Sequence, residues 1–212
     1  MAQVGSGDQV VGDGSEQRDA HRVRGIGHLR HPVVFGGLIG VVGGAAFLLA
    51  GLAGLPAGWQ EPLRRLAVVL VGFTLVGVLF RRRILPALPP PTPGALRVYG
   101  VAVVVMLLLF PVTRLLARAV DAPTAQIALV AAVVGGHFLP FARAFSAPVF
   151  LRIGGSMLAL GLSGALVAML GVPAAGPAGA AAAGAAMLLV VVGQALRQGA
   201  PGHGASRPGA DR

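Results

Sequence analysis

Long uninterrupted apolar runs are the feature that most limits what this chain can fold into. Hydrophobic residues make up 55% of the 212 residues and charged residues only 11%, whereas about a quarter of a typical soluble domain is charged. A helix of about 20 apolar residues crosses a hydrocarbon core roughly 30 Å thick. Several such runs follow one another here, separated by short segments with arginine or proline. The sequence therefore predicts an all-α, polytopic membrane helix bundle.

The apolar runs divide the chain into one transmembrane domain, residues 32–196, and two polar tails. The six predicted spans are approximately 33–55, 63–81, 98–117, 125–143, 149–172 and 177–196. Asp121 and Ser146 each stand two residues before a proline and are predicted to cap the start of the next helix. Residues 1–31 and 197–212 are rich in glycine and polar residues, so both tails are predicted to be disordered.

The basic residues indicate an orientation rather than a nucleic-acid surface. The net charge is +10, and all 17 basic residues are arginines scattered in short segments between apolar runs. With the N-terminus inside, 13 of the 17 arginines fall on the inner side, as the positive-inside rule requires. This predicts six spans with both tails cytoplasmic, with the lipid bilayer as partner and no nucleic acid. A homo-oligomer or a membrane partner stays open, and the arginine, alanine, glycine and valine usage suggests a bacterial cell membrane.

Several kinds of chemistry lack the residues that they need. The chain has no cysteine, so thiol catalysis and cysteine-based metal sites are excluded. No predicted span contains Asp or Glu, although coupled transporters usually carry ions or protons on such carboxylates. A single histidine within the spans cannot hold a catalytic zinc ion alone. We therefore expect no metal site, no cofactor and no catalytic residue, and an enzyme is the less favoured reading.

Small residues and prolines mark where helices should pack or bend. Glycines at a spacing of four let a second helix approach closely in lipid. The residues predicted to pack helices together are Gly36, Gly40, Gly44, Gly135, Gly136 and Gly155. Prolines inside the third and fourth spans remove a backbone donor, so kinks are predicted at Pro111 and Pro140. The last span begins PAGAAAAGAA and, being rich in alanine, is predicted to depend on close packing against its neighbours.

One segment, Val133 to Phe145, holds the only histidine inside an apolar run. Pro140 cannot donate to the carbonyl of Gly136, which leaves a polar notch beside His137. Other polar side chains at helical spacing extend this into a predicted intramembrane cluster of His137, Ser156, Gln126 and Ser163. Equal distances from the turn near Ser146 predict that His137 and Ser156 face each other across spans four and five. A structural histidine that bonds a backbone carbonyl is the alternative.

The segment GHFLPFA resembles segments in small multi-pass membrane proteins of bacteria, of the kind found in actinobacteria. The resemblance covers one span and implies no activity. The favoured hypothesis is a non-enzymatic integral membrane protein for small-solute transport, sensing or scaffolding. The alternative is a membrane enzyme that acts on a lipid or polyprenyl phosphate, with His137 as base and inner arginines binding the phosphate.

Overall fold

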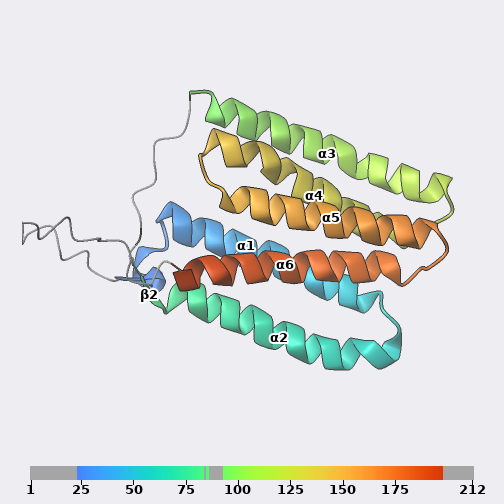
Figure 1. Ribbon diagram of the computed structural model, residues 1–212, viewed down its shortest axis with the longest axis horizontal. Helices are drawn as coiled ribbons and strands as arrows, with labels where there is room; N and C mark the ends of the chain where they lie inside the picture. Colours follow the sequence, from blue (N-terminus) through green and yellow to red (C-terminus); the bar gives the residue numbers. More distant parts are fainter. Residues whose placement is uncertain (1–22, 84, 86–92, 198–212) are drawn as a thin grey trace, which may run out of the picture.

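Six helices dominate the computed structural model, which describes residues 23–83, 85 and 93–197 (Figure 1). Each of the six is long and apolar enough to cross a membrane, so the predicted all-α six-helix bundle of an integral membrane protein is confirmed. The helices are α1 (Pro32–Ala53), α2 (Ala57–Leu79), α3 (Ala95–Ala119), α4 (Ala125–Ala144), α5 (Val149–Met169) and α6 (Ala175–Arg197).

The helix boundaries differ most from the prediction at the start of α2. This helix begins at Ala57 rather than near residue 63, so Trp59 and Glu61 belong to it. Its 23 residues span about 34 Å at 1.5 Å per residue. The missed turns contain Gln60, Glu61 and Pro62, and these residues made the segment look like a loop by hydropathy. Gln60 supports the α1–α2 turn, because its side-chain amide donates to the carbonyl of Leu55 at 2.7 Å.

A short ordered element precedes α1. β1 (Val23–Arg24) pairs antiparallel with β2 (Arg82–Arg83), and η2 (Gly25–His28) follows it. Gly25 is buried against the end of α2, where a β-carbon would collide with the carbonyl of Val78. Residues 23–31 were predicted to belong to a disordered tail, whereas the structure pairs Val23–Arg24 with β2 and sets Gly25 against the end of α2. Residues 1–22 and 198–212 of the predicted tails lie outside the described residues.

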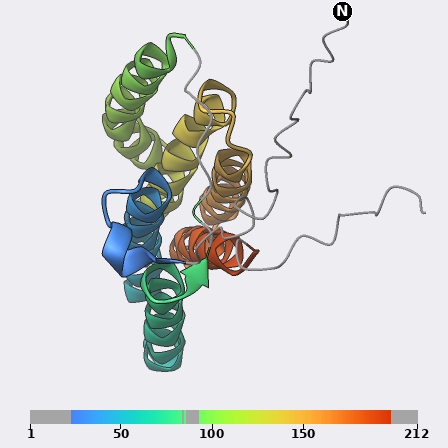
Figure 2. The ribbon, with the colours of Figure 1, turned by 90° about the vertical axis from the view of Figure 1, so that its left-hand side faces the viewer.

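The last helix, α6, lies at the centre of the bundle. It packs against α1, α2, α4 and α5, whereas α2 and α3 lie at opposite margins (Figures 1 and 2). In its most apolar 18-residue window 56% of the residues are buried, against 11% for α3. The alanine-rich sequence allows this, because small side chains let neighbouring backbones come close. The close packing predicted for this span is present in the structure.

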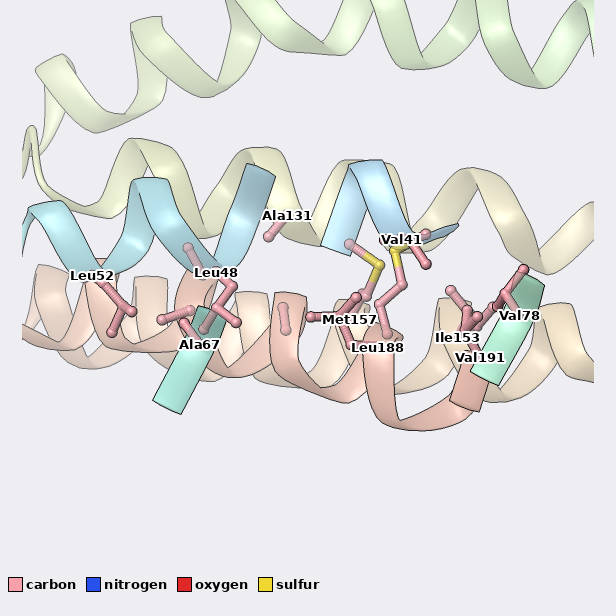
Figure 3. Packing of buried hydrophobic residues seen from close by; sticks show 14 of the residues in the cluster. Val41, Leu48, Leu52, Ala67, Val78, Ala131, Ile153, Met157, Leu188 and Val191 are labelled. Carbon is pink, nitrogen blue, oxygen red and sulfur yellow. The ribbon is translucent and has the colours of Figure 1, made fainter. Parts of the chain in front are cut away.

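The main apolar core lies where α1, α2 and α5 meet α6 (Figure 3). Met157 of α5 and Leu188 of α6 are both 0% exposed, and Leu48 of α1 and Val78 of α2 belong to the same cluster. Glycine sets how close these helices come. A β-carbon on Gly184 would lie 2.5 Å from the carbonyl oxygen of Gly44 on α1, so the two backbones are in direct contact.

Three turns between helices share one backbone motif, at a constant interval of 25 residues. Asp121, Ser146 and Gly171 each have a left-handed φ, of 50°, 48° and 98°. In each turn the next N–H donates to a carbonyl five residues back, as from Ala147 to Ala142, which is a Schellman ending. The prediction that Asp121 and Ser146 cap the following helices is therefore wrong. Each ends the preceding helix, and neither α4 nor α5 has a side-chain cap.

The two ends of the bundle differ in charge. One end, here called the arginine-rich end, is where the chain places Arg24, Arg30, Arg81, Arg82, Arg83, Arg97, Arg143, Arg152 and Arg197. The opposite end carries Arg64, Arg65, Arg114 and Arg118. The two acidic residues in the described part of the chain, Glu61 and Asp121, also lie at that opposite end. An even number of helices brings both ends of the described chain to the arginine-rich end (Figure 1).

A candidate ligand groove between helices α3, α4 and α5

His137 lies in the second half of α4, and its ring is tied to its own helix. The Nδ1 atom bonds the carbonyl oxygen of Val134 one turn earlier. A carbonyl can only accept, so Nδ1 carries the proton and donates. In the neutral ring Nε2 is then an acceptor, available to a second partner. The histidine thus has the carbonyl bond that the structural alternative requires, with one nitrogen left over.

Pro140 leaves a second acceptor in the same helix, the carbonyl oxygen of the residue before His137. It lies inside the continuous helix α4 and has no N–H to donate to the carbonyl of Gly136. Gly136 has no side chain to cover this oxygen, and a β-carbon placed there would have no heavy atom within 4 Å. These two acceptors, the Gly136 carbonyl oxygen and Nε2 of His137, are here called the polar spot of α4. Pro111 likewise lies within continuous α3.

Gly136 and His137 lie in the wall of a groove of about 680 Å³, a volume typical of small-molecule sites. Helices α3, α4 and α5 all contribute to its walls. The lining includes Arg97, Val101, Val105 and Leu109 of α3, Leu129, Gly136, His137 and Pro140 of α4, and Leu158 and Leu162 of α5. His137 and Arg97 are the two ionisable side chains of the lining. The groove is therefore mostly apolar, with the polar spot of α4 and one cationic side chain, Arg97, in its wall.

Along the helix axes the groove is about as long as one membrane leaflet is thick, and it is open on the side of the bundle. On α3 its lining runs from Arg97 to Leu109, about 18 Å along the helix, and half of the hydrocarbon core is about 15 Å. Val101 is 63% exposed and Leu162 is 49% exposed, so the walls belong to the outer surface of the bundle. In a bilayer this surface faces lipid.

An aromatic cluster braces the groove towards the arginine-rich end. Tyr99 of α3 stacks on Phe141 of α4 with ring centroids 5.4 Å apart. Phe141 is 4% exposed and meets the His137 ring edge-on at 5.3 Å. From α5, Phe150 stacks on Phe138 at 6.0 Å. Such pairs each contribute about 0.5–1.5 kcal/mol beyond area burial, so they hold α3, α4 and α5 in register beside His137.

The structure does not join His137 and Ser156 as the sequence analysis expected. The Ser156 hydroxyl donates to the carbonyl of Ile153 in its own helix at 3.1 Å. The α4–α5 contact runs through Gly135 and Gly154. His137 and Ser156 each lie two residues further on, about 200° around their helices, so both point away from that contact. His137 instead lines the groove that α3 borders. The equal depth of the two residues did not determine which face of α4 packs against α5.

The other polar residues of the predicted cluster lie apart from the groove. Gln126 is half-buried and borders a separate crevice of about 340 Å³ between α1, α4 and α6, nearer the opposite end. Ser163 is exposed, and its hydroxyl donates to the carbonyl of Leu160 in its own helix. The described residues bring no group of three His, Cys, Asp or Glu side chains together.

The glycines predicted to pack helices fall into two groups. A β-carbon on Gly40, Gly44 or Gly135 would lie under 3.0 Å from a neighbouring helix. At Gly36, Gly136 and Gly155 it would meet nothing within 4 Å. The glycines that α5 uses for close packing are Gly154, Gly161 and Gly164. Sequence reasoning missed these, although small residues seven and ten positions apart mark a single helix face.

No family model matches the chain, and comparisons with curated proteins and with solved structures gave no match. The groove therefore has to be interpreted from its own residues. Arg97 and Arg143 were not singled out from the sequence, where the enzyme alternative assigned the phosphate only to the inner arginines as a group. The available signal was their position: each lies within three residues of the end of a helix that also lines the groove.

Proposed function

We propose that this integral membrane protein binds an apolar or amphiphilic small molecule from the bilayer and acts as a non-enzymatic sensor or scaffold. The observation that supports this is the lateral groove between α3, α4 and α5. Its lining residues are apolar apart from Arg97 and His137, and Gly136, whose carbonyl receives no bond from Pro140, is among them. Such a site favours a hydrocarbon chain, and it can in addition accept a hydrogen bond from a ligand that carries a donor. The resemblance of the His137 segment to segments of bacterial membrane proteins supports a bacterial cell membrane as the proposed location.

The groove favours binding over solute transport. Its α4 lining runs from Leu129 to Pro140, about 16 Å along the helix, which is about half of a hydrocarbon core. A polar solute would need a hydrated path across the whole bundle. The buried polar side chains of the described residues, Thr74 and Thr113, instead bond carbonyls of their own helices. The ligand is therefore expected to enter from the lipid.

An enzyme that acts on a phosphorylated lipid is the second candidate. It is favoured by one observation, the presence of His137 and Arg97 in the same groove. With Nδ1 held by Val134, Nε2 could act as the base and the guanidinium could hold the phosphate. Incubation with labelled phospholipids or polyprenyl phosphates tests this reading. Turnover that is lost in His137→Ala would replace the sensor proposal with the enzyme.

Photolabelling tests the binding proposal directly. Purified protein in phosphatidylcholine vesicles is irradiated with a long-chain alcohol that carries a diazirine, and labelled peptides are identified by mass spectrometry. Label is expected on α3 and α4 residues of the groove. Gly136→Leu should reduce it, because the new side chain enters the groove from a position with open space around it. Gly155→Leu is the matched control, an equally open glycine outside the groove. Unchanged labelling in Gly136→Leu would contradict the proposal.

A further inference from the structure

We infer that the ligand of the groove is an anionic phospholipid of the leaflet at the arginine-rich end, with one acyl chain in the groove and its phosphate between Arg97 and Arg143. This inference rests on the proposed function and names the class of ligand. It follows from where the two guanidinium groups lie relative to the groove and from the charges around them.

The two arginines border one continuous opening. Arg97 lines the groove itself, and Arg143 lines an adjoining hollow of about 500 Å³. Both cavities share Val98 of α3 and Pro140 of α4 in their walls. The opening therefore has a cation on each of the two helices that form it. A phosphate diester at this point could accept hydrogen bonds from both.

No carboxylate competes with a phosphate at this opening in the described part of the chain. Glu61 and Asp121, the described acidic residues, lie at the other end of the bundle. The one ion pair that the described residues form joins Glu61 to Arg65 at 2.9 Å. Arg97 and Arg143 are both exposed. Their charge is therefore directed at the membrane surface, where an anionic headgroup is the complementary partner.

The dimensions of the groove fit an acyl chain of the same leaflet. The lining runs about 18 Å from Arg97 to Leu109, slightly more than the half-thickness of about 15 Å of a hydrocarbon core. A phosphate at the membrane surface and a chain that ends near the midplane therefore occupy its full length. His137 lies seven residues before the end of α4 at Ala144, about 10 Å along the helix, so it meets the chain rather than the headgroup.

Competitive photolabelling tests the inference. Phosphatidylglycerol and phosphatidylcholine with the same diazirine-bearing acyl chain are each added to phosphatidylcholine vesicles that contain the full chain. Phosphatidylglycerol is expected to label the groove peptides at least about five-fold more, since each arginine near the surface favours an anionic lipid by roughly that factor. The double variant Arg97→Gln/Arg143→Gln should reduce this preference towards one. Arg114→Gln/Arg118→Gln, the paired arginines of the opposite end, is the matched control and should preserve it.

The outcomes separate this inference from the proposed function. Equal labelling by the two phospholipids, or a preference that survives Arg97→Gln/Arg143→Gln, overturns the anionic phospholipid while leaving the groove as a binding site. Stronger labelling by a diazirine-bearing polyprenyl phosphate than by phosphatidylglycerol also overturns it. A failure of the neutral diazirine alcohol to label the groove overturns the proposed function itself. Circular dichroism of each variant shows that the helices are intact.

Discussion

Gly135 of α4 and Gly154 of α5 approach each other backbone to backbone, each filling the space where the other would carry a side chain. A β-carbon on Gly135 would lie 2.8 Å from the carbonyl oxygen of Gly154, and one on Gly154 would lie 2.7 Å from that of Gly135. Real β-carbons do not come this close to an oxygen without displacing the backbone. The pair therefore sets the separation of α4 and α5. It also determines which face of α4 packs against α5, and so leaves His137 on another face.

Alanine at this contact should weaken the bundle. Gly135→Ala and Gly154→Ala are each expected to lower the free energy of unfolding in detergent by about 1–3 kcal/mol, the usual range for overpacking. The neighbouring glycines are the controls, because a β-carbon at Gly136 or Gly155 meets nothing within 4 Å. Denaturant titrations followed by circular dichroism would compare the four variants. Equal loss at Gly135 and Gly136 would contradict the observed packing.

The α1–α6 contact makes a parallel prediction. Gly184→Ala places a methyl group 2.5 Å from the carbonyl oxygen of Gly44, so we expect a destabilisation of about 1–3 kcal/mol. Gly193→Ala in the same helix has open space and should be neutral or slightly stabilising, since alanine favours helix over glycine. Thermal unfolding in a single detergent gives both values. A neutral Gly184→Ala would show that α1 and α6 are further apart than described.

The repeated turn predicts substitutions of opposite sign. Gly171 has φ +98°, which alanine adopts only with strain, so Gly171→Ala should destabilise by about 1–2 kcal/mol. Asp121 and Ser146 already hold positive φ with a β-carbon present, so Asp121→Gly and Ser146→Gly should be neutral or stabilising by up to about 1 kcal/mol. Melting temperatures of the three single variants, measured side by side, test the shared motif. A stabilising Gly171→Ala would contradict it.

Pro140→Ala is expected to remove one of the two acceptors of the polar spot, the free carbonyl of Gly136. Alanine restores the N–H that can donate to the Gly136 carbonyl, and one such bond contributes about 0.5–1.5 kcal/mol to stability. We therefore expect a more stable helix and weaker photolabelling by the long-chain alcohol. His137→Phe, which keeps a ring beside Phe141 but removes Nε2, should weaken labelling without the gain in stability. A Pro140→Ala protein that is less stable and still fully labelled would show that the carbonyl is already satisfied.

The orientation follows from the unequal ends. Reporter fusions at Pro90 and Ser146 are expected inside the cell, and fusions at Trp59 and Asp121 outside. The reason is that nine of the described arginines gather at one end, and positive segments stay on the cytoplasmic side. An outside signal at Pro90 would overturn both the orientation and the assignment of the lipid leaflet to the arginine-rich end.

The sequence was sufficient for the number and type of helices because hydropathy over 20 residues is a local property. The sequence was insufficient to predict which face of each helix packs against its neighbours. His137 was expected to meet Ser156 on α5, but which side of α4 meets α5 depends on Gly135, and that choice is made by three-dimensional packing. The α2 start was missed because Trp59 to Pro62 read as a loop. Gly136 and Gly155 were expected at contacts, although the neighbouring Gly135 and Gly154 make them, and one position rotates a helix face by about 100°.

The central place of α6 has a consequence for biosynthesis. α1 and α6 pack against each other, yet α1 ends at Ala53 and α6 begins at Ala175. At about 5–20 residues per second, α1 waits on the order of 6–24 seconds in the membrane before its main neighbour is translated. During that time α6 is absent from the centre of the bundle, and the glycine-lined face of α1 that later packs against it is open to other chains. Termination between Met169 and Ala175 therefore leaves five helices without the one around which they assemble, and earlier termination leaves fewer. Such a chain is expected to be removed by membrane proteases.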